Sequence, residues 1–455
     1  MKIVTIHKSL SKAPRLTLIF AGWGMDANPF SDVEINGYDI AVAYDYREID
    51  FSEAENLCSG YDEILIVAWS FGVPAAAEFM NRNESRLPIS RCIAVNGTLY
   101  PSHDTLGIPA EIFNLTLNNI SPAAMLKFYR RMCGAENIMR SFSACMPTRD
   151  ISELKEELQA IAERETVTDP RFDRAYISQR DRIIPPLNQR ACWDKHNIET
   201  IEIDGGHLPD FNAILSREII DKQRVERSFN SALETYDSRA TVQHLVARRL
   251  LELWMEFAEL PSHGEILEFG VGSGFYTRLL RRHLSADIKL RLWDLAPASD
   301  EVEQCDAETA VTNLENESLA AMTSSSTVQW FNSFPRFLKR CVKALAPGGV
   351  AAFSTYGPET YREIAPFQKN RLHYFDATTL TQQLEEMKQQ KLISEYRVYE
   401  EITTLDFLTP RDLIAHLRES GVNATQSPDV RGAIAMARAS LKRLTYQPLY
   451  LLLKR

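Results

Sequence analysis

The segment from Ile64 to Ala77 reads ILIVAWSFGVPAAA, in which a continuous apolar run meets a serine and then a helix-forming stretch. A serine nucleophile at a strand end needs a sharp strand-to-helix turn, so the residues two before and two after it must be small. Ala68 and Gly72 meet this requirement around Ser70. The pattern predicts a nucleophile at Ser70 and an oxyanion donor at the N–H of Phe71, where the next helix begins.

A base and an acid follow later in the chain, each directly after a predicted strand. His207 lies in DGGHLPDF, and Asp181 ends the run RAYISQRD. The order Ser, Asp, His is that of α/β-hydrolases. Each feature alone is common, because most serines after strands are structural. A serine turn, an oxyanion loop, an acid and a histidine, each at a strand end and in the expected order, together favour catalysis. Asp104, in PSHDTLGIP, is the alternative acid and the less favoured one.

A second oxyanion donor is expected in the loop after an early strand. The segment FAGWGMD (Phe20–Asp26) fits, because two glycines flank Trp23 and let the backbone approach a substrate. We therefore expect the Trp23 N–H to be the second donor.

A different chemistry is indicated by EILEFGVGSGF, which contains Glu268, Gly270, Gly272 and Gly274. A lone GxGxG is a weak signal that also suits dinucleotide folds. The acid two residues before the first glycine favours S-adenosylmethionine, because such an acid lies near the methionine amine while the glycines let the backbone contact the cofactor.

Two further acids follow the next predicted strands. Asp294, in RLWDLAP, stands where an acid binds ribose hydroxyls, and Asp306, in QCDAET, stands where an adenine contact is expected. Each acid alone suits an ordinary helix cap or turn. Together with LAPGGVAAFSTYG, they predict a class I methyltransferase domain. A carboxylate acceptor is already a nucleophile, so no general base is nominated there.

Strand and helix patterns place these motifs in two α/β domains. Strands are predicted at Leu16–Gly22, Ile64–Trp69, Arg91–Gly97, Arg174–Asp181 and Ile198–Gly206, as in a doubly wound sheet. The alternation restarts after residue 240. The polar segment from Phe211 to Arg239 lacks Gly and Pro, which predicts two helices and a boundary near Asp221, giving domains at 1–220 and 221–455.

The segment from Ser121 to Arg149 lacks strand signals and carries five basic residues against one acid, a local net charge of +4. Met125, Phe128 and Met132 recur at helical spacing, so the segment is predicted to be helical. On charge alone, a solvated helix face is favoured over a lid that meets an acidic partner.

Composition limits the remaining function classes. The chain has 455 residues and a formal net charge of -10, which argues against general nucleic-acid binding. Its seven cysteines include no CxxC pair and no zinc spacing, so no metal site is predicted. The N-terminus lacks the apolar core of a signal peptide, and no run suits a membrane span. These features predict a soluble cytoplasmic protein.

The first half resembles the BioG-type pimeloyl-acyl-carrier-protein methyl ester esterases. The resemblance covers roughly residues 1–220 and rests on LTLIFAGWGMD, VAWSFGV, GTLYPSHDTLGIP, KFYRRMCG and GGHLPDF. It implies an α/β-hydrolase core and a helical lid, at about 115–165, with basic residues that contact an acidic carrier protein. By this resemblance the candidate carrier contacts are Lys127, Arg130, Arg131 and Arg140, which reverses the preference for a solvated face.

The second half resembles the BioC-type malonyl-acyl-carrier-protein O-methyltransferases, roughly from Arg227 to the C-terminus. The resemblance rests on RSFNSALETYDSRATVQ, SSSTVQWF and FSTYGPETYREI. This chain has EFGVGSGF in place of a Cys-Gly-Thr-Gly loop, and SSSTVQW in place of an Asn-Leu-Ala-Leu-Gln-Trp run. Candidate acceptor-site residues are Tyr236, Gln329, Trp330 and Tyr356, although aromatic residues at such positions are more often core.

Together the resemblances imply biotin precursor synthesis with S-adenosylmethionine as cofactor and an acyl carrier protein as partner. Methylation would hide the malonyl carboxylate during fatty-acid elongation, since an unpaired charge in an apolar tunnel is costly. Hydrolysis of the pimeloyl ester would end elongation. Two alternatives remain open: a catalytically dead hydrolase-like module that binds the carrier, and a thioesterase–methyltransferase fusion in another acyl pathway.

Overall fold

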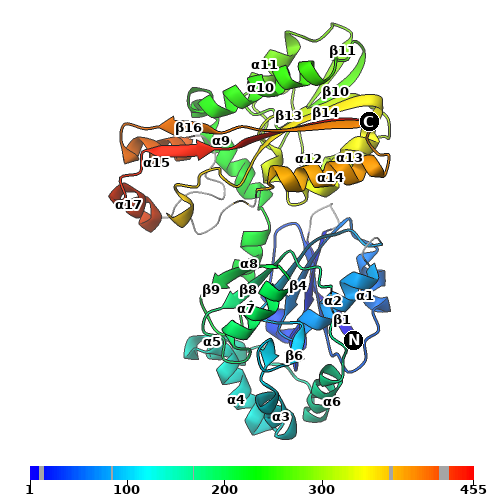
Figure 1. Cartoon of the computed structure of the whole chain (residues 1–455), viewed down its shortest axis with the longest axis vertical. Coiled ribbons are helices and arrows are strands. Elements are labelled where there is room, and N and C mark those ends of the chain that lie inside the picture. The colour runs from blue at the N-terminus through cyan, green and yellow to red at the C-terminus, as the bar shows by residue number, and fades with distance from the viewer. Residues whose placement is uncertain (10–14, 84–85, 168, 368–371, 373, 420–429) are drawn as a thin grey trace. The chain divides into compact units, whose positions relative to one another are not determined.

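The computed structural model describes residues 1–9, 15–83, 86–167, 169–367, 372, 374–419 and 430–455, with only the backbone of residues 232–239, 419 and 430–431. Residue contacts divide the chain into two compact units, Met1–Ser216 and Arg217–Arg455. Each unit is an α/β domain with its own seven-stranded sheet (Figure 1). The predicted α/β class is confirmed for both halves.

The N-terminal sheet has the strand order β1-β3-β2-β4-β5-β8-β9. Only the pair of β1 with β3 is antiparallel, and the other neighbours are parallel. The strands are β1 (Lys2–His7), β2 (Arg15–Phe20), β3 (Asp39–Tyr44), β4 (Glu63–Trp69), β5 (Ile89–Val95), β8 (Arg174–Ser178) and β9 (Glu199–Ile203).

Burial explains which of these strands could be predicted. Every residue of β2 and β4 is buried, as continuous apolar runs at the centre of a parallel sheet should be. All five predicted strands have counterparts in the sheet, whereas β1 and β3 were not predicted. The strand β1 lies at the edge and is mostly exposed or half-buried, so it lacks the apolar pattern.

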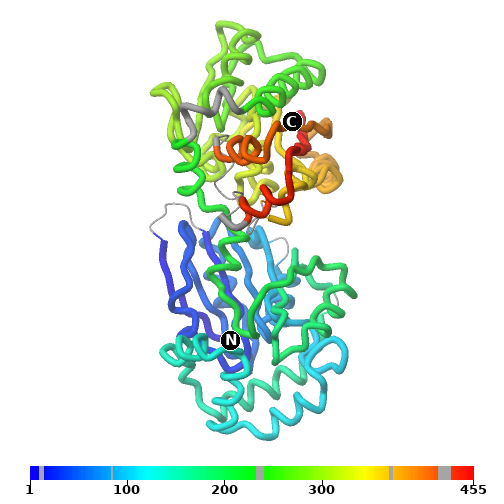
Figure 2. The backbone as a smooth tube through the Cα atoms, turned by 90° about the vertical axis from the view of Figure 1, so that its left-hand side faces the viewer, coloured from blue at the N-terminus to red at the C-terminus, as the bar shows by residue number. Residues whose placement is uncertain are grey.

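Helices α1 (Ser52–Cys58) and α2 (Gly72–Asn83) pack on β1, β2 and β4, while α7 (Pro186–Lys195) packs on β8 and β9. Between β5 and β8 the chain forms the short strands β6 (Tyr100–Ser102) and β7 (Gly107–Ile108). The helices α3 (Ala110–Asn118), α4 (Pro122–Cys133), α5 (Glu136–Ser143) and α6 (Ile151–Ala162) follow. Figures 1 and 2 both show α3–α6 gathered at one end of the N-terminal sheet.

The C-terminal sheet has the order β12-β11-β10-β13-β14-β18-β15. The first five strands are parallel, and β18 pairs antiparallel with β14 and β15. The strands are β10 (Gly264–Phe269), β11 (Ile288–Asp294), β12 (Glu303–Gln304), β13 (Leu319–Ser324), β14 (Leu345–Tyr356), β15 (Glu395–Glu400) and β18 (Pro448–Lys454). A separate ribbon pairs β16 (Thr403–Asp406) with β17 (Arg443–Tyr446).

Two apolar clusters cover the two faces of this sheet. Ile266 and Leu267 are neighbours in β10 but belong to different clusters, because successive strand side chains point to opposite faces. Figure 1 shows α10 (Thr241–Phe257) and α11 (Phe275–Arg281) on one face, with α13 (Phe334–Ala344) and α14 (Ala377–Gln389) on the other.

The remaining helices are α8 (Phe211–Glu218), α9 (Lys222–Arg239), α12 (Ala307–Ala310), α15 (Pro410–Glu419) and α17 (Val430–Arg438). The two helices predicted within Phe211–Arg239 correspond to α8 and α9. In the C-terminal half, the strands β13, β15 and β18 and the ribbon β16–β17 were not predicted.

Candidate functional site

Ser70 occupies the turn between β4 and α2. Its φ is +55°, a left-handed conformation that residues other than glycine rarely adopt. A side chain at Gly72 would collide with the carbonyl of Phe20 on the neighbouring strand β2, so glycine is needed for the helix to begin here. Such a strained turn holds a nucleophile at the end of a sheet.

Three side chains from distant parts of the sequence form one hydrogen-bonded line. Nε2 of His207 lies 2.9 Å from Oγ of Ser70, and Nδ1 of His207 lies 2.7 Å from Oδ2 of Asp181. The Asp181 carboxylate also accepts two backbone N–H groups and the amide of Gln189. These bonds fix the carboxylate so that Nδ1–H of His207 donates to it and Nε2 can accept the serine proton.

Asp104, the alternative acid, has a different role. Its Oδ1 accepts the N–H of Ala110 at 2.9 Å, at the start of α3, and the residue is exposed. Of the two candidates, Asp181 is therefore the acid in contact with His207.

Asn96 was missed by the sequence analysis, yet it joins the loops that carry the acid and the base. It is fully buried at the end of β5, and its Nδ2 donates to Ser178 Oγ at 2.8 Å and to the carbonyl of His207 at 2.9 Å. Its Oδ1 accepts the Ser178 N–H at 2.7 Å. A polar residue followed by glycine at the end of an apolar strand was the available signal.

A pocket of about 500 Å³ opens beside Ser70 and His207. Its wall includes Trp23 and Phe71, and in the described part of the chain neither backbone N–H has a hydrogen-bond partner. Both groups are thus free to bind an oxyanion, as the sequence predicts. The rest of the wall is largely apolar and includes Ile108, Ile112, Phe113, Phe128, Met132 and Leu158, which suits an acyl chain.

A buried ion-pair network holds the loop that carries Trp23. Glu157 of α6 is fully buried, and its carboxylate accepts the N–H of Gly24 at 3.1 Å and the N–H of Tyr46 at 2.9 Å. Arg149 lies 2.6 Å from Glu157 and 3.0 Å from Asp45. Burial raises the pKa of Glu157, and the Arg149 charge opposes that rise. The network connects the lid helix α6 to the oxyanion loop.

The other four basic residues of the +4 segment are on the surface. Lys127, Arg130, Arg131 and Arg140 are exposed, and no ion pair or hydrogen bond joins their side chains to any residue in the described ranges. Arg131 also lines the pocket beside Ser70. Arg149 differs because it is buried and forms ion pairs with Glu157 and Asp45. The four remaining basic side chains of the segment face solvent, and they are the four predicted carrier contacts.

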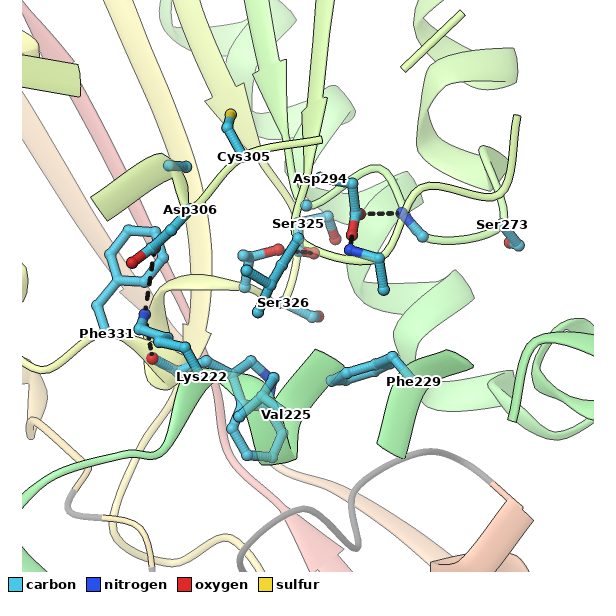
Figure 3. Close-up of a pocket in the computed structure, with 17 residues that line it drawn as sticks. Lys222, Val225, Phe229, Ser273, Asp294, Cys305, Asp306, Ser325, Ser326 and Phe331 are labelled. Atoms are coloured by element: carbon cyan, nitrogen blue, oxygen red, sulfur yellow. Dashed lines mark hydrogen bonds and ion pairs between the residues drawn. The ribbon is translucent and has the colours of Figure 1, made fainter. Parts of the chain in front are cut away.

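A second pocket, of about 800 Å³, lies at the carboxyl ends of β10 and β11 (Figure 3). Its wall includes Gly270, Gly272, Asp294 and Asp306, four of the six residues predicted to bind the cofactor. A side chain at Gly270 would collide with Thr327, and φ is +68° at Gly270 and +54° at Gly272. Here glycine lets the backbone itself form the wall of the pocket.

The two acids in this wall also make local bonds. Asp294 accepts the N–H of Gly272 and the N–H of Ala296, each at 2.7 Å, and burial raises the pKa of its carboxyl. Asp306 caps α12 by accepting the Glu308 N–H. Both acids are therefore turn or cap residues and pocket residues at once.

The other two predicted cofactor residues, Glu268 and Gly274, do not line this pocket. Glu268 lies behind the glycine loop, where it accepts the hydroxyl of Thr277 at 2.8 Å. Its Oε2 is buried and has no hydrogen-bond partner in the part of the chain that the structure describes, and burial raises the pKa of Glu268 to about 8. Gly274 has a φ of +75° and caps the N-terminus of α11. The unpartnered carboxylate oxygen fits a site completed by the ammonium group of S-adenosylmethionine.

Several residues of this wall were not predicted from the sequence. Lys222 and Val225 come from the start of α9, before the motif RSFNSALETYDSRATVQ, and Phe229 lies within that motif. Nζ of Lys222 lies 2.8 Å from Glu308 and 3.5 Å from Asp306, and it donates to the carbonyl of Trp330. Figure 3 shows Lys222 and Asp306 on the same side of the pocket. Three consecutive residues, Ser325–Thr327, complete the wall.

A third pocket, of about 380 Å³, shares Phe229, Ser326 and Trp330 with the second and is therefore contiguous with it. Gln329, Trp330 and Tyr356, which the sequence analysis nominated for the acceptor site, all line it. The side chain of Tyr236, the fourth nominee, lies outside the described residues.

Comparison with known proteins shows two matched families. Residues 4–214 match the family described as pimeloyl-ACP methyl esterase BioG, and residues 239–425 match a methyltransferase domain family.

A malonyl-[acyl-carrier protein] O-methyltransferase of Bacteroides fragilis is 34% identical over 464 residues, covering 96% of this chain and 92% of that relative. One from Porphyromonas gingivalis is 30% identical and covers 53% of this chain and 99% of its own length. The crystal structure of BioG from Haemophilus influenzae has 32% identity and a TM-score of 0.40, and it covers 46% of this chain and 94% of that one.

Among the residues that the structure describes, no helix is long and apolar enough to cross a membrane. These residues also contain no group of three or more His, Cys, Asp or Glu side chains with the spacing of a metal site.

Replacing Glu157 by Gln is expected to lower kcat for ester hydrolysis by about tenfold or more and to change KM little, because the loop that carries the Trp23 N–H loses its charged anchor. Glu156→Gln is the matched control, since Glu156 lies on the same helix and pairs with Arg47 but makes no bond to Arg149 or the oxyanion loop in the described structure. Equal kcat values for the two variants would contradict this role of Glu157.

Cofactor binding is expected to release a proton from Glu268 at pH 7. With a pKa of about 8, the carboxyl is mostly protonated in the protein alone, and a nearby ammonium favours the ionised form. Affinity for S-adenosylhomocysteine should therefore rise with pH up to about 8, relative to Glu268→Gln.

Calorimetry in buffers of different ionisation enthalpy counts the protons released. Wild type should release about one proton more than Glu268→Gln. Identical proton counts for the two proteins would place Glu268 outside the cofactor site.

Proposed function

Because the chain belongs to the malonyl-[acyl-carrier protein] O-methyltransferase family and its N-terminal half matches a pimeloyl-ACP methyl esterase, we propose that one polypeptide adds a methyl group and later removes it. Both resemblances predicted from the motifs are confirmed by these matches. The C-terminal domain methylates the free carboxylate of malonyl-carrier protein. The N-terminal domain hydrolyses the methyl ester of pimeloyl-carrier protein. Residues 1–220 and 221–455 are the two catalytic domains, with a lid at about 115–165.

The observation that supports the hydrolase assignment is the hydrogen-bonded triad of Ser70, His207 and Asp181 at the edge of an apolar pocket. His207 takes the Ser70 proton through Nε2, and Oγ attacks the ester carbonyl. The N–H groups of Trp23 and Phe71 stabilise the oxyanion. Methanol leaves with a proton from His207, which then activates water to hydrolyse the acyl-enzyme.

The same geometry favours an active esterase over an inert carrier-binding module. An inert module has no use for a strained serine whose hydroxyl is hydrogen-bonded to an imidazole. The N–H groups of Trp23 and Phe71, which have no hydrogen-bond partner among the described residues, would likewise have no role in such a module.

In the C-terminal domain, the residues around the second pocket fit S-adenosylmethionine, which supplies an electrophilic methyl group when bound. Gly270 and Gly272 offer backbone to the cofactor, Asp294 accepts ribose hydroxyls, and Asp306 lies toward the adenine. The contiguous third pocket takes the malonyl group and excludes water with Trp330 and its aromatic neighbours. A carboxylate needs no base, so these residues have only to orient it.

The lid suits the carrier protein as the shared partner of both domains. Lys127, Arg130, Arg131 and Arg140 of α4 and α5 are exposed, and so are apolar side chains of α3, α4 and α5, namely Ile112, Leu115, Leu126 and Ile138. An acidic protein with an apolar strip would find both complements there. Arg131, at the wall of the esterase pocket, is placed to guide the tethered acyl chain.

The chemistry links the two reactions into one sequence. Methylation removes the terminal charge that an apolar elongation tunnel rejects. Elongation by other enzymes lengthens the neutral ester, and hydrolysis then restores the carboxylate of the biotin precursor. The two domains therefore act on the same carboxyl end at different chain lengths.

Ser70→Ala protein, supplied with S-adenosylmethionine and malonyl-carrier protein, is expected to yield a carrier heavier by one methylene in intact-mass spectrometry. The substitution removes the nucleophile, so the ester cannot be hydrolysed. Acetyl-carrier protein, which has no free carboxylate, is the control and should keep its mass.

An unchanged malonyl-carrier, with cofactor binding demonstrated, would contradict the proposed acceptor and with it the pathway assigned to both domains.

A further inference from the structure

The pocket next to the cofactor site is rich in neutral hydrogen-bonding side chains. Its described wall includes Tyr356, Tyr361, Tyr374 and Tyr446, together with the amides of Gln243 and Gln329. Burial raises the pKa of the Tyr361 phenol, which is therefore neutral. Such a wall can bind an anion by hydrogen bonds without a fixed counter-charge.

Most of these groups already have partners within the domain. Tyr446 lies 2.7 Å from Nε2 of His416, and Tyr356 lies 3.1 Å from Oγ of Ser326. Nε2 of Gln329 donates to the carbonyl of Ser326 at 2.5 Å, which leaves only its amide oxygen without a partner. An oxygen acceptor would repel a carboxylate, so Gln329 cannot be the anchor for one.

Gln243 is the exception. It is only 9% exposed, it lines the pocket, and neither end of its amide has a hydrogen-bond partner among the residues that the structure describes. A buried amide without partners costs free energy unless a ligand satisfies it. The oxygen is the fully buried end of this amide, so the NH2 group is the end open to the pocket, where it can donate to an anion.

The position of Gln243 in the fold also favours an anion. It is the third residue of α10, a helix of 17 residues whose N-cap, Ala240, makes no side-chain cap bond. The first turn of a helix carries partial positive charge from its aligned peptide dipoles. A carboxylate bound by Gln243 therefore lies at the favourable end of α10.

We propose that Gln243 and the N-terminus of α10 form the subsite for the free carboxylate of the malonyl group, an inference that rests on the proposed methyltransferase function. A neutral donor holds one carboxylate oxygen and leaves the other nucleophilic, whereas a paired cation would stabilise the anion against reaction. Methylation removes the charge, so the product loses the attraction to the helix end and is released. The same contact selects malonyl over acetyl chains.

The test compares binding of malonyl-carrier and acetyl-carrier protein to the full chain loaded with S-adenosylhomocysteine. Wild type should bind malonyl-carrier about 10- to 100-fold more tightly, the range expected for a hydrogen bond to a charged group. Gln243→Leu should lose most of this preference and leave acetyl-carrier binding unchanged. Gln389→Leu, on the exposed surface of α14, is the matched control and should behave like wild type.

A second variant distinguishes loss of the carboxylate contact from a general folding defect. Gln243→Glu keeps the size and polarity of the side chain but places a carboxylate against the malonyl carboxylate, so it should weaken malonyl-carrier binding at least as much as the leucine variant. Unchanged affinity for S-adenosylhomocysteine would show that the cofactor site is intact in both.

The outcomes separate the two proposals. If wild type prefers malonyl-carrier and both Gln243 variants keep that preference, the subsite is wrong and the methyltransferase function stands. If wild type shows no preference and transfers no methyl group to malonyl-carrier, the proposed function fails, and the subsite fails with it.

Discussion

Both sites depend on one constraint: a parallel strand that is buried on both faces can present reactive groups only at its carboxyl end. In the first domain β4 is buried throughout, and Ser70 follows it with a φ of +55°. In the second, β10 leads into Gly270, with a φ of +68°. In both, a sharp turn then starts a helix. At Ser70 the strained backbone conformation exposes a hydroxyl group. At Gly270 the absence of a side chain lets the backbone itself approach a cofactor.

The two sites differ in how completely they are formed within the chain itself. Around Ser70, the side chains of Asp181, Asn96 and Glu157 are all hydrogen-bonded, so the hydrolase geometry is preorganised. Among the described residues of the methyltransferase, no hydrogen bond satisfies the Glu268 Oε2 atom or the amide of Gln243. Such atoms are costly unless a ligand satisfies them. The second site is therefore one that binding completes, which suits a reaction between two ligands.

The sequence predicted the parts that local pattern determines and missed those that depend on packing between distant segments. Apolar runs marked the central strands, and small residues marked the turn at Ser70. Nothing local distinguishes Glu157 from the other acids of α6, because its burial arises only where the helix meets the loop at Gly24. Lys222 and Gln243 likewise gain a role only when α9 and α10 pack beside the pockets. Edge strands such as β1 were missed because half-exposed residues weaken the apolar signal.

Opposed activities in one polypeptide are useful only if the esterase spares the malonyl methyl ester that its neighbour makes. The apolar pocket beside Ser70 supplies the means, because the pimeloyl chain buries about four more methylenes, each worth about 0.8 kcal/mol. The decisive measurement is kcat/KM of the full chain, without S-adenosylmethionine, for the methyl esters of pimeloyl-carrier and malonyl-carrier protein. The account predicts that the longer ester is preferred by about a hundredfold. Equal values would mean that each methyl group is removed as soon as it is added, and would contradict it.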